Sequence, residues 1–73
     1  MTMKTVEVFK TNVGAADAAK RVIALLHQHY PDSRITIDLE DCDKVLRIEG
    51  RNLIRNRVIS VVSGTGHHCD MLE

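Results

Sequence analysis

Two short segments of this 73-residue chain carry side chains that can bind a metal ion or act as nucleophiles. Residues 67–70 read His-His-Cys-Asp, and residues 40–43 read Glu-Asp-Cys-Asp. Zinc, nickel and copper accept such mixtures of imidazole, thiolate and carboxylate ligands. One hypothesis is therefore an atypical transition-metal site that uses His67, Cys42 or Cys69, with copper or zinc as the bound ion.

Strand geometry limits this site. If residues 67–72 form a strand, His67 and Cys69 face one side of the sheet and His68 and Asp70 face the other, so the four cannot share one ion. The competing interpretation places Cys69 and Met71 in the core and the histidines at the surface. The acidic residues at 40–43 lack the spacing and glycine of a calcium-binding loop, which favours a solvated turn.

Composition narrows the class of protein. Ten basic and ten acidic side chains cancel, and 44% of the residues are hydrophobic while 27% are charged, as in globular domains. A zero net charge gives no long-range attraction to nucleic acid or to an anionic membrane. No apolar stretch approaches the roughly 20 residues of a membrane span, and the N-terminus lacks a secretory pattern. We expect a cytoplasmic protein with reduced cysteines, in which Leu72-Glu73 is either native or tag-derived.

The first half of the chain predicts a strand followed by a helix. Residues 4–10 alternate, with Val6 and Val8 on one side and Phe9 on the other. Asn12 to Gly14 break this pattern. From Ala15 the apolar period changes to about 3.6, which predicts a helix that Pro31 ends. Its predicted buried residues are Ala18, Ala19, Val22, Ile23, Leu25 and Leu26.

The second half predicts a hairpin, a helix and a last strand. Residues 34–39 and 44–49 alternate around the polar turn at 40–43, and Gly50 is expected to stop the second of these strands. A helix is predicted over residues 52–63, with Asn52 as its N-cap and Leu53, Ile54, Val58, Val61 and Val62 on its apolar side. Residues 67–72 complete the pattern as a short strand.

This order of strand, helix, strand, strand, helix, strand predicts one domain over residues 1–73. Right-handed crossovers give an α+β, ferredoxin-like βαββαβ sandwich, in which two helices cover one face of a four-stranded antiparallel sheet. The first strand is then expected between the third and fourth. A disulfide between Cys42 and Cys69 is not expected, because that arrangement separates them by about two strand spacings, whereas a disulfide needs Cα atoms within about 7 Å.

The small-residue bend Val-Gly-Ala-Ala-Asp-Ala-Ala at residues 13–19, with Val22 and Leu26 after it, resembles the heavy-metal-associated (HMA) domain of copper chaperones and metal-pumping ATPases. That family carries Met-X-Cys-X-X-Cys in this bend. Spacing from the helix places Val13 and Gly14 at the start of the motif and Ala15 and Ala18 on its two cysteines. The Gly66-His67 pair is similar to the glycine and aromatic residue that open the family's last strand.

The departure from the family motif decides what the resemblance implies. Two thiolates on one helical turn bind Cu(I) or Zn(II) because both can face one soft ion. The methyl groups of Ala15 and Ala18 have no lone pair to donate. The resemblance therefore implies the fold of this family without its metal site.

Nucleic-acid binding and catalysis have little support. Modules of this topology bind RNA by stacking bases on aromatic residues of their first and third strands. This chain has only Phe9 and Tyr30 as aromatics, and the arginines at 47, 51, 55 and 57 are better explained as solvated or protein-docking surface. There is no paired-carboxylate cleft, phosphate cradle or base aligned with a cysteine.

Three hypotheses for function remain. The first is a small non-enzymatic binding or interaction module of the HMA type, with no cofactor, that docks a protein partner or associates with itself through an open sheet edge. The second is the atypical copper or zinc binder described above. The third is a ligand-sensing regulatory domain of the same topology, such as the amino-acid-binding ACT type.

Overall fold

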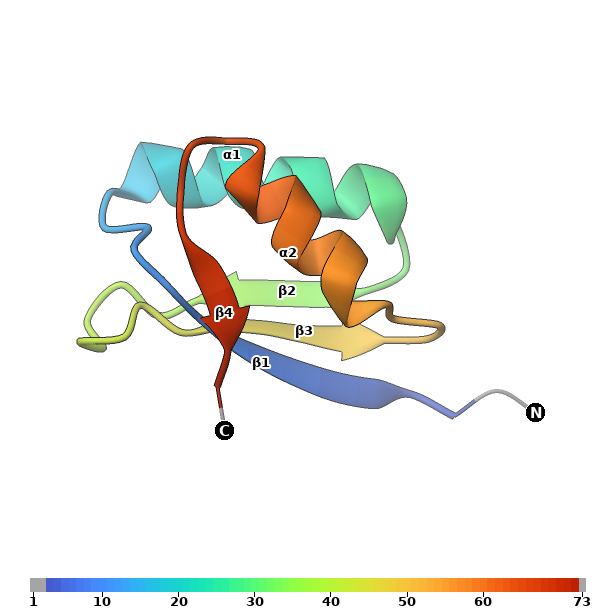
Figure 1. Cartoon of the computed structure of the whole chain (residues 1–73). Coiled ribbons are helices and arrows are strands. Elements are labelled where there is room, and N and C mark those ends of the chain that lie inside the picture. Colours follow the sequence, from blue (N-terminus) through green and yellow to red (C-terminus); the bar gives the residue numbers. More distant parts are fainter. Residues whose placement is uncertain (1–2, 73) are drawn as a thin grey trace.

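The predicted order of strands and helices is present in the computed structural model, which describes residues 3–72. The elements are β1 (Thr5–Thr11), α1 (Ala16–His29), β2 (Arg34–Ile37), β3 (Leu46–Gly50), α2 (Arg55–Ser63) and β4 (Cys69–Met71). The four strands form one antiparallel sheet in the order β2-β3-β1-β4 (Figure 1). The chain has the α+β ferredoxin-like fold, and β1 lies between β3 and β4 as expected.

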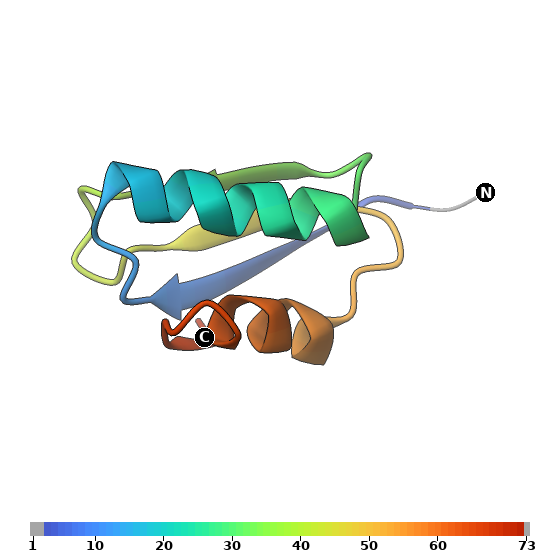
Figure 2. The same ribbon diagram turned by 90° about the horizontal axis from the view of Figure 1, so that it is seen from above.

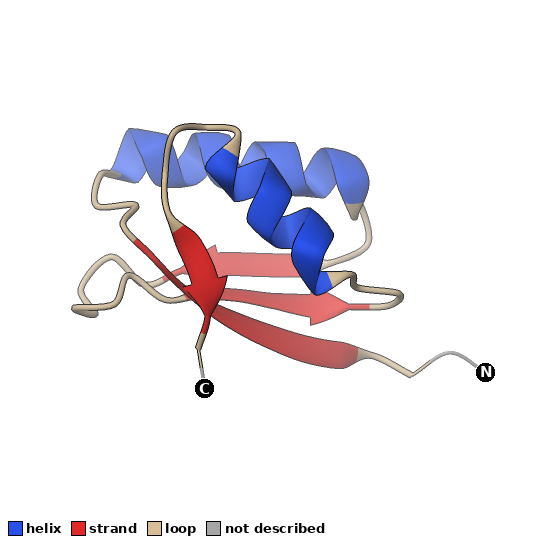
Figure 3. Ribbon diagram, in the orientation of Figure 1, coloured by secondary structure: helices blue, strands red, loops and turns tan. Residues whose placement is uncertain are grey.

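Both helices pack on the same face of the sheet (Figures 2 and 3). The two helices contact each other, α1 also contacts β2, and α2 contacts β4. The opposite face of the sheet carries no helix in the described part of the chain. We call this uncovered side the open face.

The core lies between the sheet and the helices, and strand alternation explains which side chains enter it. Phe9 on β1 and Leu46 and Ile48 on β3 point toward the helices and are fully buried. Val6 and Val8, at alternate positions of β1, point to the open face instead. From the helices the buried side chains are Ala19, Val22 and Leu26 of α1 and Val58 and Val62 of α2, on the apolar stripes that the sequence predicts.

Helix α2 begins later than the sequence predicts, and the expected cap is wrong. The N-cap residue is Ile54, without a side-chain cap hydrogen bond, and the helix starts at Arg55 rather than at residue 52. Asn52 has a φ of +57°, in the left-handed region that asparagine tolerates better than most residues. It therefore turns the chain between β3 and α2. Ile54, predicted on the buried stripe, is 52% exposed.

The strand ends also differ from the prediction. Strand β2 stops at Ile37 because the carboxylate of Asp38 accepts the backbone N–H of Glu40 at 3.1 Å and turns the chain. Strand β3 begins only at Leu46, after Lys44 with its φ of +45°, and it includes Gly50. Strand β4 is confined to Cys69–Met71. In the core interpretation Met71 was expected to be buried with Cys69, but Met71 is 39% exposed and only Cys69 is buried.

Candidate functional site

Three loops meet at one end of the sheet, because β1 and β2 end there and β3 and β4 begin there. The bend after β1, the β2–β3 hairpin tip and the loop before β4 are held together by Thr11 and Asn12. The backbone N–H of Thr11 donates to Asp43 O at 2.9 Å, and its hydroxyl donates to Lys44 O at 2.7 Å. The side-chain oxygen of Asn12 accepts the backbone N–H of His68 at 2.8 Å. Segments far apart in the sequence, from Thr11 to His68, thus come together at this end of the sheet.

The four positions that match the family motif offer no metal donor at this end. Val13 is fully buried in the core, and Gly14 is exposed, with the Lys44 side chain beside it. Ala15 is the exposed N-cap of α1 and makes no side-chain cap hydrogen bond, while Ala18 is half-buried on the first turn. The exposed N-cap and the first turn of α1 therefore carry methyl groups at these two positions.

Cys42 is exposed at the hairpin tip and lies beside two carboxylates. One ligand atom from each of Asp41, Cys42 and Asp43 can be chosen so that all lie within 4.8 Å of one another. The Asp41 carboxylate accepts the backbone N–H of Asp43 at 2.8 Å, which closes this turn. Among residues 3–72, no other group of three or more histidine, cysteine or acidic side chains is so close together. The sequence favours a solvated turn here and gives no sign that these two carboxylates lie beside the thiol.

The structure separates His67 and Cys69 from that group. Cys69 points into the core beside β1, where desolvation, together with the nearby charge of Asp70, raises the pKa of its thiol from 9.0 to about 11. A thiol with a raised pKa remains protonated at neutral pH, and the thiolate is the form that binds metals. The three predicted ligands Cys42, His67 and Cys69 do not form one cluster in the described residues.

His67 is half-buried in the loop before β4 and bonds to a neighbour in the same loop. The hydroxyl of Thr65 donates to Val62 O at 2.6 Å, so its oxygen accepts from His67 Nδ1 at 2.9 Å. In this arrangement Nδ1–H donates to Thr65, and the lone pair of Nε2 is left free to bind a cation.

The opposite end of the sheet carries an open depression of about 770 Å³. It lies between the C-terminal end of α1 and the end of β3. Its lining is mostly polar and comprises Lys4, His29, Tyr30, Pro31, Asp32, Ser33, Gly50, Arg51 and Asn52. Tyr30 is buried there, and its hydroxyl accepts the backbone N–H of Ile54 at 3.4 Å. This depression has the volume and the polar lining to receive a small polar ligand.

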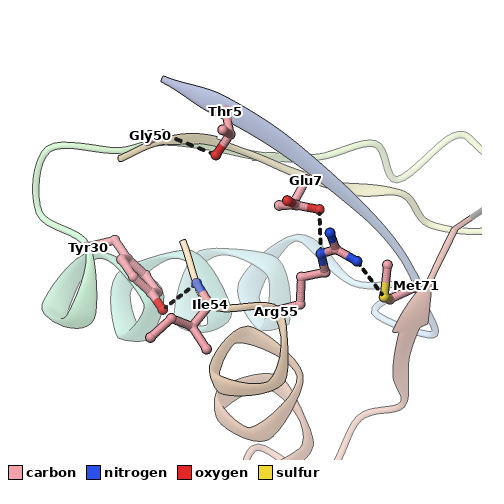
Figure 4. A network of polar contacts seen from close by, with 7 residues as sticks. All are labelled: Thr5, Glu7, Tyr30, Gly50, Ile54, Arg55 and Met71. Atoms are coloured by element: carbon pink, nitrogen blue, oxygen red, sulfur yellow. Dashed lines mark hydrogen bonds and ion pairs between the residues drawn. The ribbon is translucent and has the colours of Figure 1, made fainter. Parts of the chain in front are cut away.

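The start of α2 contacts β1 and β4 through one arginine (Figure 4). Arg55 Nε lies 3.3 Å from the Glu7 carboxylate, and its guanidinium contacts the Met71 sulfur at 3.8 Å. The other arginines lie elsewhere: Arg47 on the open face, Arg51 at the depression and Arg57 on α2. The arginines that the sequence groups together therefore form no continuous basic surface.

The open face combines valines with charged residues. Strand register places Val6 opposite Glu49 and Val8 opposite Arg47. Val45, just before β3, lies beside Asp38, whose backbone N–H donates to Val45 O at 2.9 Å. Val6 is 42% exposed and Val8 and Val45 are half-buried. We call Val6, Val8 and Val45 the open-face band. Phe9 and Tyr30 are buried on the helix side, so neither aromatic residue can stack a base on this face.

No family model matches this chain, and no curated protein matches it. Within the described residues, none of the helices combines the length and the apolar character that crossing a membrane requires.

Proposed function

We propose that this chain is a small non-enzymatic interaction module, similar to an HMA domain whose metal-binding cysteines are replaced by alanine. The fold supports this proposal, because its elements follow the order that the resemblance implies. The bend supports it too, since Val13, Gly14, Ala15 and Ala18 supply neither a ligand nor a nucleophile. These four positions therefore offer no side chain for metal binding or catalysis, which favours contact with another macromolecule as the role of this chain.

The observation that carries the proposal is the open-face band. β1 is a central strand, yet its outward positions hold Val6 and Val8, and Val45 directly precedes β3. No helix covers these side chains in residues 3–72. Valines on an uncovered sheet face, with Glu49 opposite Val6 and Arg47 opposite Val8, combine apolar and charged groups, as protein interfaces do.

Site-specific photo-crosslinking in the native host tests this function. A photoreactive amino acid in place of Val6 should give one adduct of discrete size, and Val8→Glu introduced into the same chain should abolish it. The matched control is the same photoreactive residue in place of Lys20, which is exposed on α1 and should give no such adduct. The absence of a discrete adduct from position 6, or equal adducts from both positions, would refute the proposal.

A second candidate function is transition-metal binding, and the turn around Cys42 favours it. The ligand atoms of Asp41, Cys42 and Asp43 are close enough to face one ion. Zinc titration followed by NMR tests it on wild type, Cys42→Ser and His67→Ala. Binding lost only in Cys42→Ser assigns the hairpin tip, and binding lost in both variants assigns a site shared with His67. The absence of binding at stoichiometric zinc rejects the function.

A third candidate, ligand sensing, is favoured by the depression at the far end of the sheet. Amino acids added singly should then shift the amide resonances of Ser33, Gly50 and Asn52 more than those of the bend. Unchanged spectra with the full set of amino acids would exclude an amino-acid sensor.

A further inference from the structure

Strand β2 is an edge strand with unpaired backbone groups on its outer side. Figure 2 shows no other element of residues 3–72 beyond it. The Asp38 N–H donates to Val45 O of the β3 segment at 2.9 Å. In an antiparallel ladder alternate residues point the same way, so Arg34 and Thr36 also bond toward β3. The N–H and C=O groups of Ile35 and Ile37 therefore point outward.

The side chains of this edge have a symmetrical charge pattern. Ile35 and Ile37 point toward the helices, as their burial shows. Arg34, Thr36 and Asp38 are exposed on the open face. The positive charge of Arg34 thus lies two residues before Thr36. The negative charge of Asp38 lies two residues after it, on the same side of the sheet.

From this pattern we propose that a second copy of this chain pairs with β2, antiparallel, about a two-fold axis at Thr36. Ile35 of one copy then exchanges backbone hydrogen bonds with Ile37 of the other. Arg34 lies directly opposite Asp38 of the second copy, and symmetry repeats this pair. The two four-stranded sheets join into one continuous sheet, with all helices on one side.

The neighbouring registers fit less well. An axis at Ile35 places Asp32 against Asp38 of the second copy, and like charges directly opposite each other are destabilising. An axis at Ile37 needs Leu39 to extend the strand, but Leu39 lies in the turn that begins at Asp38. Only the axis at Thr36 uses extended backbone and opposes unlike charges.

The pairing is expected to be weak, because β2 has only four residues. A short strand edge buries little surface, as weak and transient interfaces do. We therefore expect a dissociation constant on the order of 0.1 mM. This proposal concerns a different surface from the open-face band. A monomeric chain would refute the dimer and leave the crosslinking result from position 6 unaffected.

The test is sedimentation equilibrium of the intact chain over a concentration series, with charge-reversal variants. Arg34→Glu places an acidic residue opposite Asp38 of the second copy at both symmetry-related pairs. Asp38→Lys places a basic residue opposite Arg34 of the second copy in the same way. Each should weaken dimerisation about tenfold or more, since attraction becomes repulsion at both symmetry-related pairs. The matched controls are Lys10→Glu and Asp70→Lys, which make the same charge changes on the open face near β4. Neither control should change the dissociation constant.

Mixing the variants distinguishes this register from a general charge effect. An equimolar mixture of Arg34→Glu and Asp38→Lys restores unlike charges at both pairs, so a heterodimer of near wild-type affinity should form. The doubly substituted chain should dimerise with itself for the same reason. A monomer at about 1 mM, a dimer that tolerates both single variants, or a mixture that does not associate would overturn the proposal.

Discussion

Asn12 and His68 join the two ends of the sequence at the candidate site, because the Asn12 side-chain oxygen accepts the His68 backbone N–H at 2.8 Å. Asn12 lies just after β1, and His68 lies just before β4. This bond holds the loop that contains His67 against the bend that contains Gly14 and Ala15. It is the direct link between the bend that resembles the HMA motif and the segment that carries the histidines.

Asn12→Ala should lower the free energy of unfolding by about 1 kcal/mol, the usual net value of one hydrogen bond. The His68 amide should then exchange with solvent faster than in wild type. Asn12→Asp keeps an acceptor oxygen and is the matched control, with an exchange rate near that of wild type. Chemical denaturation and hydrogen exchange measure both quantities. An unchanged His68 exchange rate in Asn12→Ala would contradict the described contact.

Gly50→Ala should destabilise the fold. The added Cβ would overlap Ser33 Oγ and lie 3.0 Å from Ser33 Cβ, so the chain between α1 and β2 must shift. Overpacking of this kind costs about 1–3 kcal/mol. Gly14→Ala is the control, because its added Cβ would meet nothing closer than 3.9 Å. Thermal unfolding of both variants compares the two sites, and equal stabilities would be inconsistent with the close approach at Gly50.

The buried thiol of Cys69 should make stability fall at high pH. Burial raises its pKa from 9.0 to about 11, so the folded state holds the thiol proton more tightly than the unfolded chain does. The resulting contribution to stability is complete below pH 9 and is lost as the pH rises through about 11. Cys69→Ala lacks this group, so its stability should decline less steeply over this range. Chemical denaturation at a series of pH values measures both stabilities. An equal decline of the free energy of unfolding with pH in the two proteins would show that Cys69 does not contribute.

The fold was predictable because its elements are strongly periodic. Val22 and Leu26 mark the helix stripe, and Leu46 and Ile48 mark the core face of β3, as predicted. The start of α2 was not predictable, since Asn52 is a common helix cap and nothing in the sequence reveals its positive φ. At that point the geometry of the turn overrides the capping preference.

At the candidate site, the order of strands and helices determines which loops meet but not which side chains do. Topology alone brings the bend, the hairpin tip and the loop before β4 to one end of the sheet. The proximity of Cys42 to Asp41 and Asp43 depends on an Asx turn, for which the Asp-Cys-Asp sequence is the only signal. Arg55 and Met71 were missed as neighbours, because the late start of α2 and the short β4 decide their contact.

The interaction proposal depends on alanine methyl groups replacing the thiols of a metal-binding bend. Cu(I) titration of wild type and of the Ala15→Cys, Ala18→Cys double variant, followed through the amide resonances of residues 13–18, tests this most directly. Thiolates at a helix N-terminus form readily and bind Cu(I), so the double variant should bind one ion at the bend, while wild type shows no shift there. Cu(I)-dependent shifts at the bend of wild type, or a double variant that binds no ion, would contradict the account.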